Sequence, residues 1–349
     1  MSLFDETPGG FEQEEGLNEV VSFSGEELAN RDVDCIPTLF DPIFPKVGLV
    51  TVAGLSDAGK SAFLRQLLIY LVADFDYFIG FEVKAEHKKG IYFSTEDGEE
   101  SMSYLLKKQL RGISKEASIL KNIEFVFDYG LSLLDTLEDK LQANNYDAVV
   151  IDAFGDVFTG QMNQNNVVRS FLTKFDRLAK KYKCLIIFLH HCGKNSEYKE
   201  PSKNSVIGSQ GYEAKMRLVI ELREDWNDPD LRHLCIVKGN YLPKEYKSES
   251  YVLRFDEYML FHNTGRRVPF EDLAKPTESD AEKEELKERA IELRQQNKSV
   301  REIAKELGKG KSTIDRWTKG VVPSHESTKE NSGTGQVKMN GHSYQKAPF

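Results

Sequence analysis

Cysteine is scarce in this chain, and its placement excludes a zinc or dithiol site of the usual kind. The four cysteines, Cys35, Cys184, Cys192 and Cys235, include no C-x-x-C pair. We therefore expect reduced thiols in a cytoplasmic protein. The chain also lacks any apolar run of about 18 residues, so no membrane span is predicted. No basic stretch followed by an apolar core stands at the N-terminus, so no signal peptide is predicted.

Charge is unevenly distributed along the 349 residues. The net charge is −9, and residues 1–34 alone hold ten acidic residues and one basic residue. We expect residues 1–35 to be an acidic, flexible arm. Residues 298–319 hold seven bases and three acids. The acidic total therefore does not exclude contact with nucleic acid, because a phosphate backbone meets the local charge.

Beyond the arm, short apolar stretches alternate with helical patterns. Strands are predicted at 48–53, 90–95, 123–127, 148–151 and 185–189, and helices at 62–71, 99–110, 133–144 and 167–182. Such continuously apolar strands, separated by helices, predict a parallel sheet with helices on both faces. Strands at 216–222, 233–238, 251–255 and 258–261 have short connections and predict an antiparallel extension at one edge. The expected fold is therefore an α/β domain followed by a small all-α domain.

Composition also predicts the domain boundaries. We expect the α/β domain at 36–263 and a linker at 264–280, where Gly265, Pro269 and Pro276 stand among polar residues. A helical module follows at 281–320. The remaining residues, 321–349, are rich in Ser, Gly, Asn and Lys and are expected to be a disordered tail.

The most informative motif is G-x-x-x-x-G-K-S at residues 54–61, between a β-type run and a helical run. This order is typical of a P-loop, in which backbone N–H groups and a helix N-terminus surround phosphates. Lys60 is expected to reach the β- and γ-phosphates, and the Ser61 hydroxyl to bind Mg²⁺. The sequence thus predicts binding of ATP with Mg²⁺. The residues expected around the nucleotide are Gly54, Ser56, Asp57, Ala58, Gly59, Lys60, Ser61 and Ala62.

Carboxylates follow two of the predicted strands. Asp152 ends the run 148–151, where parallel sheets bind ligands, and is expected to hold Mg²⁺ through water. Glu96 and Asp97 end the strand at 90–95, and a carboxylate there would activate the attacking water. We expect Glu96 to be that base, since Asp97 points to the other side of an extended chain. The alternatives are a turn-capping Asp152 and two acids that favour the next helix N-terminus.

Two histidines end the strand at 185–189. Neighbouring side chains on a strand point in opposite directions, so only one of His190 and His191 can face the nucleotide, and alternation alone does not say which. A polar side chain at this place could sense the γ-phosphate. A metal site formed by His190, His191 and Cys192 is disfavoured, because adjacent residues do not easily ligate one ion.

The ordered set of these motifs resembles RecA-like P-loop ATPases over residues 37–261, and among them the hexameric replicative helicases of plasmids. The matching pieces are 53–61, 91–97, 149–152, 188–191 with Lys194, Gly208 through Arg217, and 238–241. The resemblance implies that Glu96 activates water and that His191 is the switch residue. It also implies that Arg217 is an arginine finger supplied to a neighbouring subunit, with Lys238 beside it. DnaB-like relatives carry an arginine two residues after this lysine, where this chain has Asn240, so the role of Lys238 stays open.

An arginine finger of this kind makes a homo-oligomer necessary, with a hexamer as the expected form. The resemblance implies DNA at its centre, contacted by residues 154–166 and 193–208. The second segment carries Lys194, Lys199 and Lys203. The alternatives are ordinary surface loops and, for Arg217, an ordinary charge on an edge strand.

The C-terminal module shows two short amphipathic helices around Gly308. Apolar residues follow helical spacing from Val300 to Leu307, and a second helix, capped by Ser312, places Ile314 and Trp317 inward. This resembles the helix-turn-helix of resolvase-like DNA-binding domains, supported by a helix at 282–296. The alternative is a helical hairpin for protein contacts. The resemblance implies Lys311, Ser312, Asp315 and Arg316 in the major groove, and Arg301 and Lys305 on the DNA backbone.

Together these features predict an ATP-hydrolysing motor or remodeller that acts on DNA in replication or in mobile-element maintenance. Two alternatives stay open. One is a DNA-binding regulator switched by ATP, and the other is a subunit that binds ATP only to assemble a protein–DNA complex.

Overall fold

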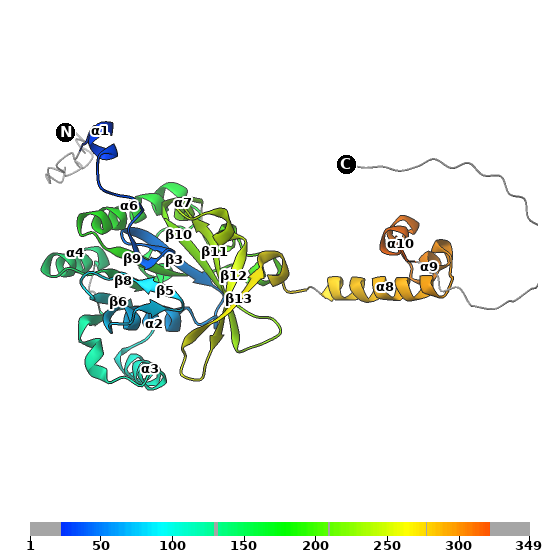
Figure 1. Ribbon diagram of the computed structural model, residues 1–349, viewed down its shortest axis with the longest axis horizontal. Helices are drawn as coiled ribbons and strands as arrows, with labels where there is room; N and C mark the ends of the chain where they lie inside the picture. Colours follow the sequence, from blue (N-terminus) through cyan, green and yellow to red (C-terminus); the bar gives the residue numbers. More distant parts are fainter. Residues whose placement is uncertain (1–21, 129–131, 209, 277, 322–349) are drawn as a thin grey trace, which may run out of the picture. The chain divides into compact units, whose positions relative to one another are not determined.

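The computed structural model describes residues 22–128, 132–208, 210–276 and 278–321. The chain divides into two compact units, Met1–Ala274 and Lys275–Phe349 (Figure 1). Most of the expected arm and all but the first residue of the expected tail lie outside the described residues. Of the arm, residues 22–35 are described, including the short helix α1 (Gly25–Ala29), which buries none of its side chains.

A nine-stranded sheet forms the centre of the first unit, in the order β13-β12-β11-β10-β3-β9-β8-β6-β7. The strands from β10 to β7 pair in parallel, and β10 to β13 pair antiparallel, which confirms the predicted fold class. The parallel strands are β3 (Gly48–Gly54), β6 (Gly90–Ser94), β7 (Ile123–Val126), β8 (Ala148–Asp152), β9 (Leu185–His191) and β10 (Leu218–Glu224). The extension contains β11 (Leu231–Gly239), β12 (Glu249–Phe255) and β13 (Phe261–Pro269).

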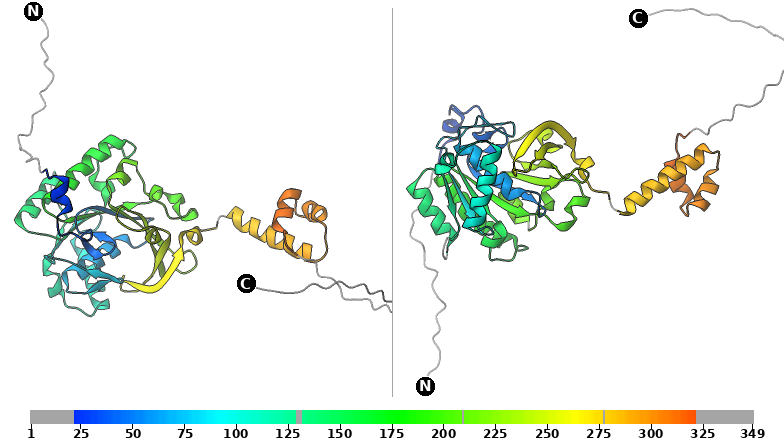
Figure 2. Two further views of the ribbon diagram at one scale, coloured as in Figure 1. Left: turned by 45° about the horizontal axis from the view of Figure 1, so that its top comes forward. Right: turned by 90° about the horizontal axis from the view of Figure 1, so that it is seen from below.

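Helices cover both faces of this sheet (Figures 1 and 2). Val150 of β8 packs in one hydrophobic cluster with residues of α2, while its neighbours Val149 and Ile151 pack in a second cluster with α4 and α6. Because alternate side chains of one strand enter different clusters, the strand is apolar throughout. The helices are α2 (Lys60–Val72), α3 (Glu99–Gly112), α4 (Leu133–Ala143), α5 (Phe154–Val157), α6 (Asn165–Lys181) and α7 (Gln210–Lys215). The 3₁₀ turns are η1 (Ala117–Asn122), η2 (Lys194–Tyr198), η3 (Lys203–Ser205), η4 (Lys244–Lys247) and η5 (Phe270–Leu273).

A small second sheet was not anticipated. It has the order β2-β1-β5-β4 and packs its aromatic side chains on α2. Phe78 lies 5.5 Å from Phe40 and 5.3 Å from Phe63 between ring centroids. Its strands have only two to four residues, too short for alternation to reveal. They are β1 (Thr38–Asp41), β2 (Phe44–Pro45), β4 (Tyr77–Phe78) and β5 (Phe81–Val83).

Two expectations for the antiparallel edge are wrong. The strand predicted at 258–261 is a turn, in which one oxygen of Asp256 accepts the N–H groups of Tyr258 and Leu260, each at 2.9 Å. The linker predicted from 264 is strand β13. Gly265 has φ +76° and lies in a bulge, where the Thr264 hydroxyl bonds Val252 O at 2.7 Å. A glycine inside a strand marks such a bulge, and here it imitated a linker.

The second unit contains three helices, α8 (Glu278–Gln295), α9 (Val300–Glu306) and α10 (Lys311–Trp317). Its core consists of Ala290, Leu293, Ile303 and Ile314, with Trp317 packed against it. Ser299 begins α9 with a capping box, accepting the Glu302 N–H at 3.3 Å. The expectation that Ser312 caps the last helix is wrong. Gly310 stands at the N-cap, because the chain becomes helical at Lys311, and Ser312 is exposed in the first turn.

Candidate nucleotide site

The P-loop connects the end of β3 at Gly54 with the start of α2 at Lys60. A Cβ at Gly54 would lie 2.3 Å from the carbonyl oxygen of Leu222 in β10, so only glycine fits at this position. Asp57 (φ +65°) and Gly59 (φ +87°) adopt the left-handed conformation that turns the chain into the helix. The loop is therefore held directly against the sheet at the carboxyl end of β3.

Lys60 lies across this loop. Its ammonium donates to the carbonyl of Leu55 at 2.7 Å, and the side chain is nearly buried. Burial lowers the pKa of Lys60, while the nearby carboxylates of Asp152 and Glu96 oppose that shift. The lysine thus stands between the loop carbonyls and the acidic side of the pocket, as a phosphate-binding lysine requires.

Asp152 stands at the tip of β8 and is almost fully buried. One carboxylate oxygen accepts a short hydrogen bond from the Tyr92 hydroxyl, and the other is buried without a hydrogen-bond partner among the described residues. Burial raises the pKa of Asp152, and the Tyr92 hydroxyl opposes this rise. A buried carboxylate oxygen with no donor beside a P-loop fits an aquated Mg²⁺, whose waters would supply the missing donors.

Both acids that follow β6 line the same pocket as the P-loop. Burial raises the pKa of Glu96, the neighbouring Asp152 and Asp156 add to this rise, and His191 and Lys60 oppose it. Asp97 instead lies 3.9 Å from the guanidinium of Arg65 on α2. The two neighbours therefore differ in surroundings. The charged groups around Glu96 are those of the nucleotide site.

Thr95 is a residue of the site that sequence reasoning missed. Its backbone N–H bonds Asp152 O at 2.8 Å, and its hydroxyl accepts the Ala153 N–H at 2.9 Å. The same hydroxyl lies 2.5 Å from a carboxylate oxygen of Asp156. These contacts fasten the end of β6 to the end of β8 and so fix Glu96 relative to Asp152. The available signal was a hydroxyl residue directly before the acidic pair.

The structure decides which histidine faces the pocket. His191 lines it, whereas His190 is buried on the opposite side between the rings of Phe154 and Tyr212, at centroid distances of 5.1 and 4.7 Å. Burial lowers the pKa of His190 to about 4. Of the two, His191 is therefore the residue placed to sense a nucleotide.

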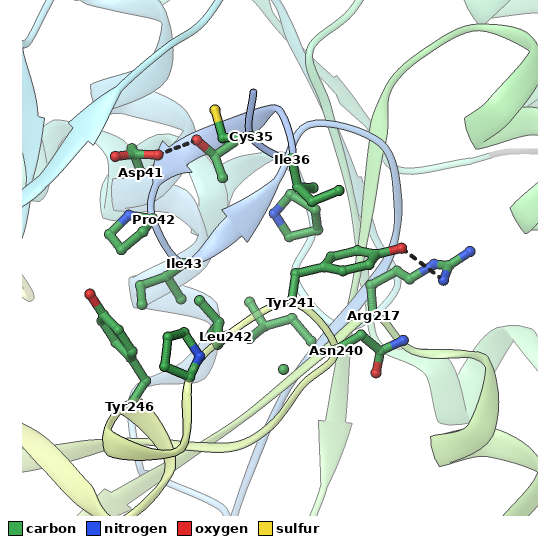
Figure 3. Close-up of a pocket in the computed structure, with 15 residues that line it drawn as sticks. Cys35, Ile36, Asp41, Pro42, Ile43, Arg217, Asn240, Tyr241, Leu242 and Tyr246 are labelled. Atoms are coloured by element: carbon green, nitrogen blue, oxygen red, sulfur yellow. Dashed lines mark hydrogen bonds between the residues drawn. The ribbon is translucent and has the colours of Figure 1, made fainter. Parts of the chain in front are cut away.

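Arg217 and Lys238 lie outside this pocket. Arg217 directly precedes β10, at the end of the parallel sheet opposite the P-loop, and its N–H bonds Leu49 O at 2.8 Å. Its guanidinium bonds the Tyr241 hydroxyl at 3.1 Å beside a cavity of about 290 Å³, which Figure 3 shows. Lys238 pairs with Glu213 at 2.9 Å. Neither residue reaches the P-loop of its own chain.

The basic segment 194–205 is held on the sheet by a buried ion pair that the sequence did not reveal. Arg223 and Glu221 of β10 pair at 2.7 Å. Arg223 donates to the carbonyls of Lys199 at 2.6 Å and Ser196 at 2.9 Å, and Glu221 accepts the Ser202 N–H at 3.0 Å. These bonds fix the backbone, while the side chains of Lys194, Lys199 and Lys203 remain exposed.

In the second unit, the residues expected to face DNA lie on one side of the short helices. All six of them are exposed, while Ile303 and Ile314 of the same helices are buried. They are Arg301, Lys305, Lys311, Ser312, Asp315 and Arg316.

A P-loop at the carboxyl edge of a parallel sheet, with carboxylates on the neighbouring strands, defines a P-loop ATPase of RecA type. The family described as AAA domain matches residues 23–197, half of the chain, and the chain belongs to that family. The family described as homeodomain-like domain matches residues 281–322.

Two solved structures are similar to this chain. The first, the ATPase domain of a helicase, is 17% identical, covers 68% of this chain and 95% of its own, and has a TM-score of 0.50. The second, the RadB recombinase, is 13% identical, covers 63% and 93%, and has a TM-score of 0.47. None of the curated proteins compared with the chain matches it. In the part of the chain that the structure describes, no helix is long and apolar enough to cross a membrane.

The burial of His190 predicts a loss of stability in acid. Its pKa falls from 6.5 to about 4 on folding, so below pH 6.5 the unfolded chain binds a proton that the folded chain does not. Stability that is present above pH 6.5 is lost as the pH falls toward 4, by up to about 3 kcal/mol.

Urea unfolding at pH 7 and pH 4.5 tests this. The free energy of unfolding should fall less for His190→Gln than for the wild type, by about 2–3 kcal/mol. His87→Gln, at an exposed position, should keep the wild-type dependence. Equal pH dependence in wild type and His190→Gln would contradict the assignment.

Proposed function

We propose that this protein is an ATP-driven motor or remodeller of DNA, with Mg²⁺·ATP bound at the P-loop of the first unit. The observation that carries the proposal is the single pocket in which Lys60, Ser61, Glu96 and His191 meet, with Asp152 beside them. Residues 36–263, extended by the rest of β13, would form the ATPase domain, and 281–320 the DNA-binding domain.

The residues of the pocket support in-line attack of water on the γ-phosphate. Lys60 would neutralise phosphate charge, and Glu96 would orient the water and take its proton. Its raised pKa brings Glu96 nearer to the range of a general base. Ser61 and the unpaired oxygen of Asp152 would hold Mg²⁺, which supplies charge stabilisation to the phosphates.

The position of Arg217 supports catalysis across a subunit interface. It lies at the opposite end of the sheet from the P-loop of its own chain, so it would serve the site of a neighbour in a homo-oligomer such as a hexamer. The motif set resembles RepA, the hexameric replicative helicase of broad-host-range plasmids. This resemblance supports a role in replication or mobile-element maintenance.

ATP hydrolysis with and without single-stranded DNA tests the motor. Wild type should be stimulated by DNA, and Glu96→Gln should lower kcat at least about a hundredfold without weakening ATP binding. Asp97→Asn is the matched control and should lower kcat less than about threefold, because Asp97 faces Arg65. Slow turnover in Asp97→Asn with normal turnover in Glu96→Gln would reverse the two assignments. Turnover unaffected by DNA would favour the ATP-switched regulator.

Mixing experiments test the role of Arg217 in a neighbour's site. Lys60→Ala and Arg217→Ala chains should each be inactive alone. Mixed oligomers should regain a measurable fraction of activity, because some interfaces combine an intact Lys60 with an intact Arg217. Lys238→Ala, mixed in the same way, shows whether this lysine acts at the interface. Failure of any mixture to exceed its separate components would exclude a finger acting between chains.

Salt dependence tests the DNA contacts of the second unit. Arg301→Ala combined with Lys305→Ala should weaken binding to duplex DNA, and should reduce the slope of log affinity against log salt by about two. Lys283→Ala, an exposed change on α8, is the control and should leave the slope unchanged. The measurement is fluorescence anisotropy of the full chain. An unchanged slope in the double variant would support the helical hairpin for protein contacts.

A further inference from the structure

The nucleotide pocket has an apolar side that no P-loop motif explains. Besides the loop and the acids, the pocket of about 440 Å³ is lined by Leu105 of α3, Phe255 at the end of β12, and Met259 in the turn that follows. These residues come from elements that carry none of the proposed catalytic groups. A large apolar surface at the edge of an otherwise polar site calls for an apolar part of the ligand.

Two buried glutamines fasten the turn between β12 and β13 to the P-loop helix. Gln66 accepts the Phe261 N–H at 2.7 Å and donates to the Phe261 carbonyl at 3.0 Å. The Gln109 amide donates to the carbonyls of Ala62 at 2.9 Å and Met259 at 3.0 Å. Met259 and Ala62, the residue after Ser61, are thus joined by one side chain. The turn is a built wall of the site.

Two phenylalanine rings of this hairpin lie against the P-loop. The rings of Phe255 and Phe261 are 4.6 Å apart, tilted by 34°. A Cβ on Gly59 would lie 2.9 Å from Phe261 and 3.5 Å from Phe255. Phe261 is fully buried, whereas Phe255 is half-buried and lines the pocket. One aromatic surface is therefore exposed to a ligand that starts at the P-loop.

We propose that Phe255, with Met259 and Leu105, receives the heteroaromatic base of the nucleotide. This inference rests on the proposed function, because it takes the triphosphate to lie on the P-loop. The base would leave the phosphates past Ala62 and meet the Phe255 ring, where stacking and dispersion favour any flat heterocycle. The hairpin that supplies the ring lies about 200 residues beyond the P-loop. Its contribution is to affinity for the nucleoside part, and it makes no contact with the phosphates.

Calorimetry of the full chain with ATP, ADP and inorganic tripolyphosphate, all with Mg²⁺, tests this. Phe255→Ala should raise the Kd for ATP and for ADP about tenfold, and should leave the Kd for tripolyphosphate unchanged. Phe255→Leu, which keeps apolar packing against Phe261, should show the same selective loss. Tyr258→Ala, in the same turn but outside the pocket lining, should change neither.

The outcomes separate the base-binding role from the proposed function. Unchanged ATP affinity in both Phe255 variants would overturn the inference and leave the function standing. Equal weakening of ATP and tripolyphosphate would show that Phe255 only supports the P-loop, and would also overturn it. Wild-type protein that binds neither ligand would overturn the function together with the inference. In Phe255→Trp, the new indole fluorescence should be quenched by ATP and unaffected by tripolyphosphate, relative to wild type.

Discussion

The whole site depends on a close backbone contact at Gly54. With no Cβ at this residue, the end of β3 can lie directly against Leu222 of β10, where any side chain would meet a carbonyl oxygen at 2.3 Å. A second close contact, between Gly59 and the ring of Phe261, brings the hairpin of the antiparallel edge onto the loop. The P-loop is thus held between two parts of the sheet, and the acids, His191 and the Phe255 ring take their places around it.

Much of this site could be predicted because a parallel sheet collects the carboxyl ends of its strands at one edge. Glu96, Asp152 and His191 each follow an apolar run, and runs of that kind identify buried strands without help from distant residues. The choice between His190 and His191 could not be made in this way. It depends on which face of β9 meets Phe154 and Tyr212, and those rings come from other elements of the chain.

The parts that escaped prediction are held by side chains far apart in the sequence. Gln66 and Phe261 are 195 residues apart, and Gln109 and Met259 are 150 apart, so no local pattern announces either contact. The Glu221–Arg223 pair sits in an otherwise apolar strand, where its charges look unfavourable until the carbonyls of segment 194–205 are seen to accept from it. Gly265 misled because a bulge and a linker favour the same residue.

One strand, β10, contacts three places that matter to the proposed motor. Leu222 lies against the P-loop, Glu221 and Arg223 hold the basic segment 194–205, and Arg217 precedes the strand at the opposite end of the sheet. Because hydrogen bonds to β3 and β11 fix β10 on both sides, it moves as a unit or not at all. A shift of the P-loop on nucleotide binding would therefore reach the basic segment through a single rigid element. No separate relay of side chains is needed to connect nucleotide state with a DNA-contacting surface, since the sheet itself joins them.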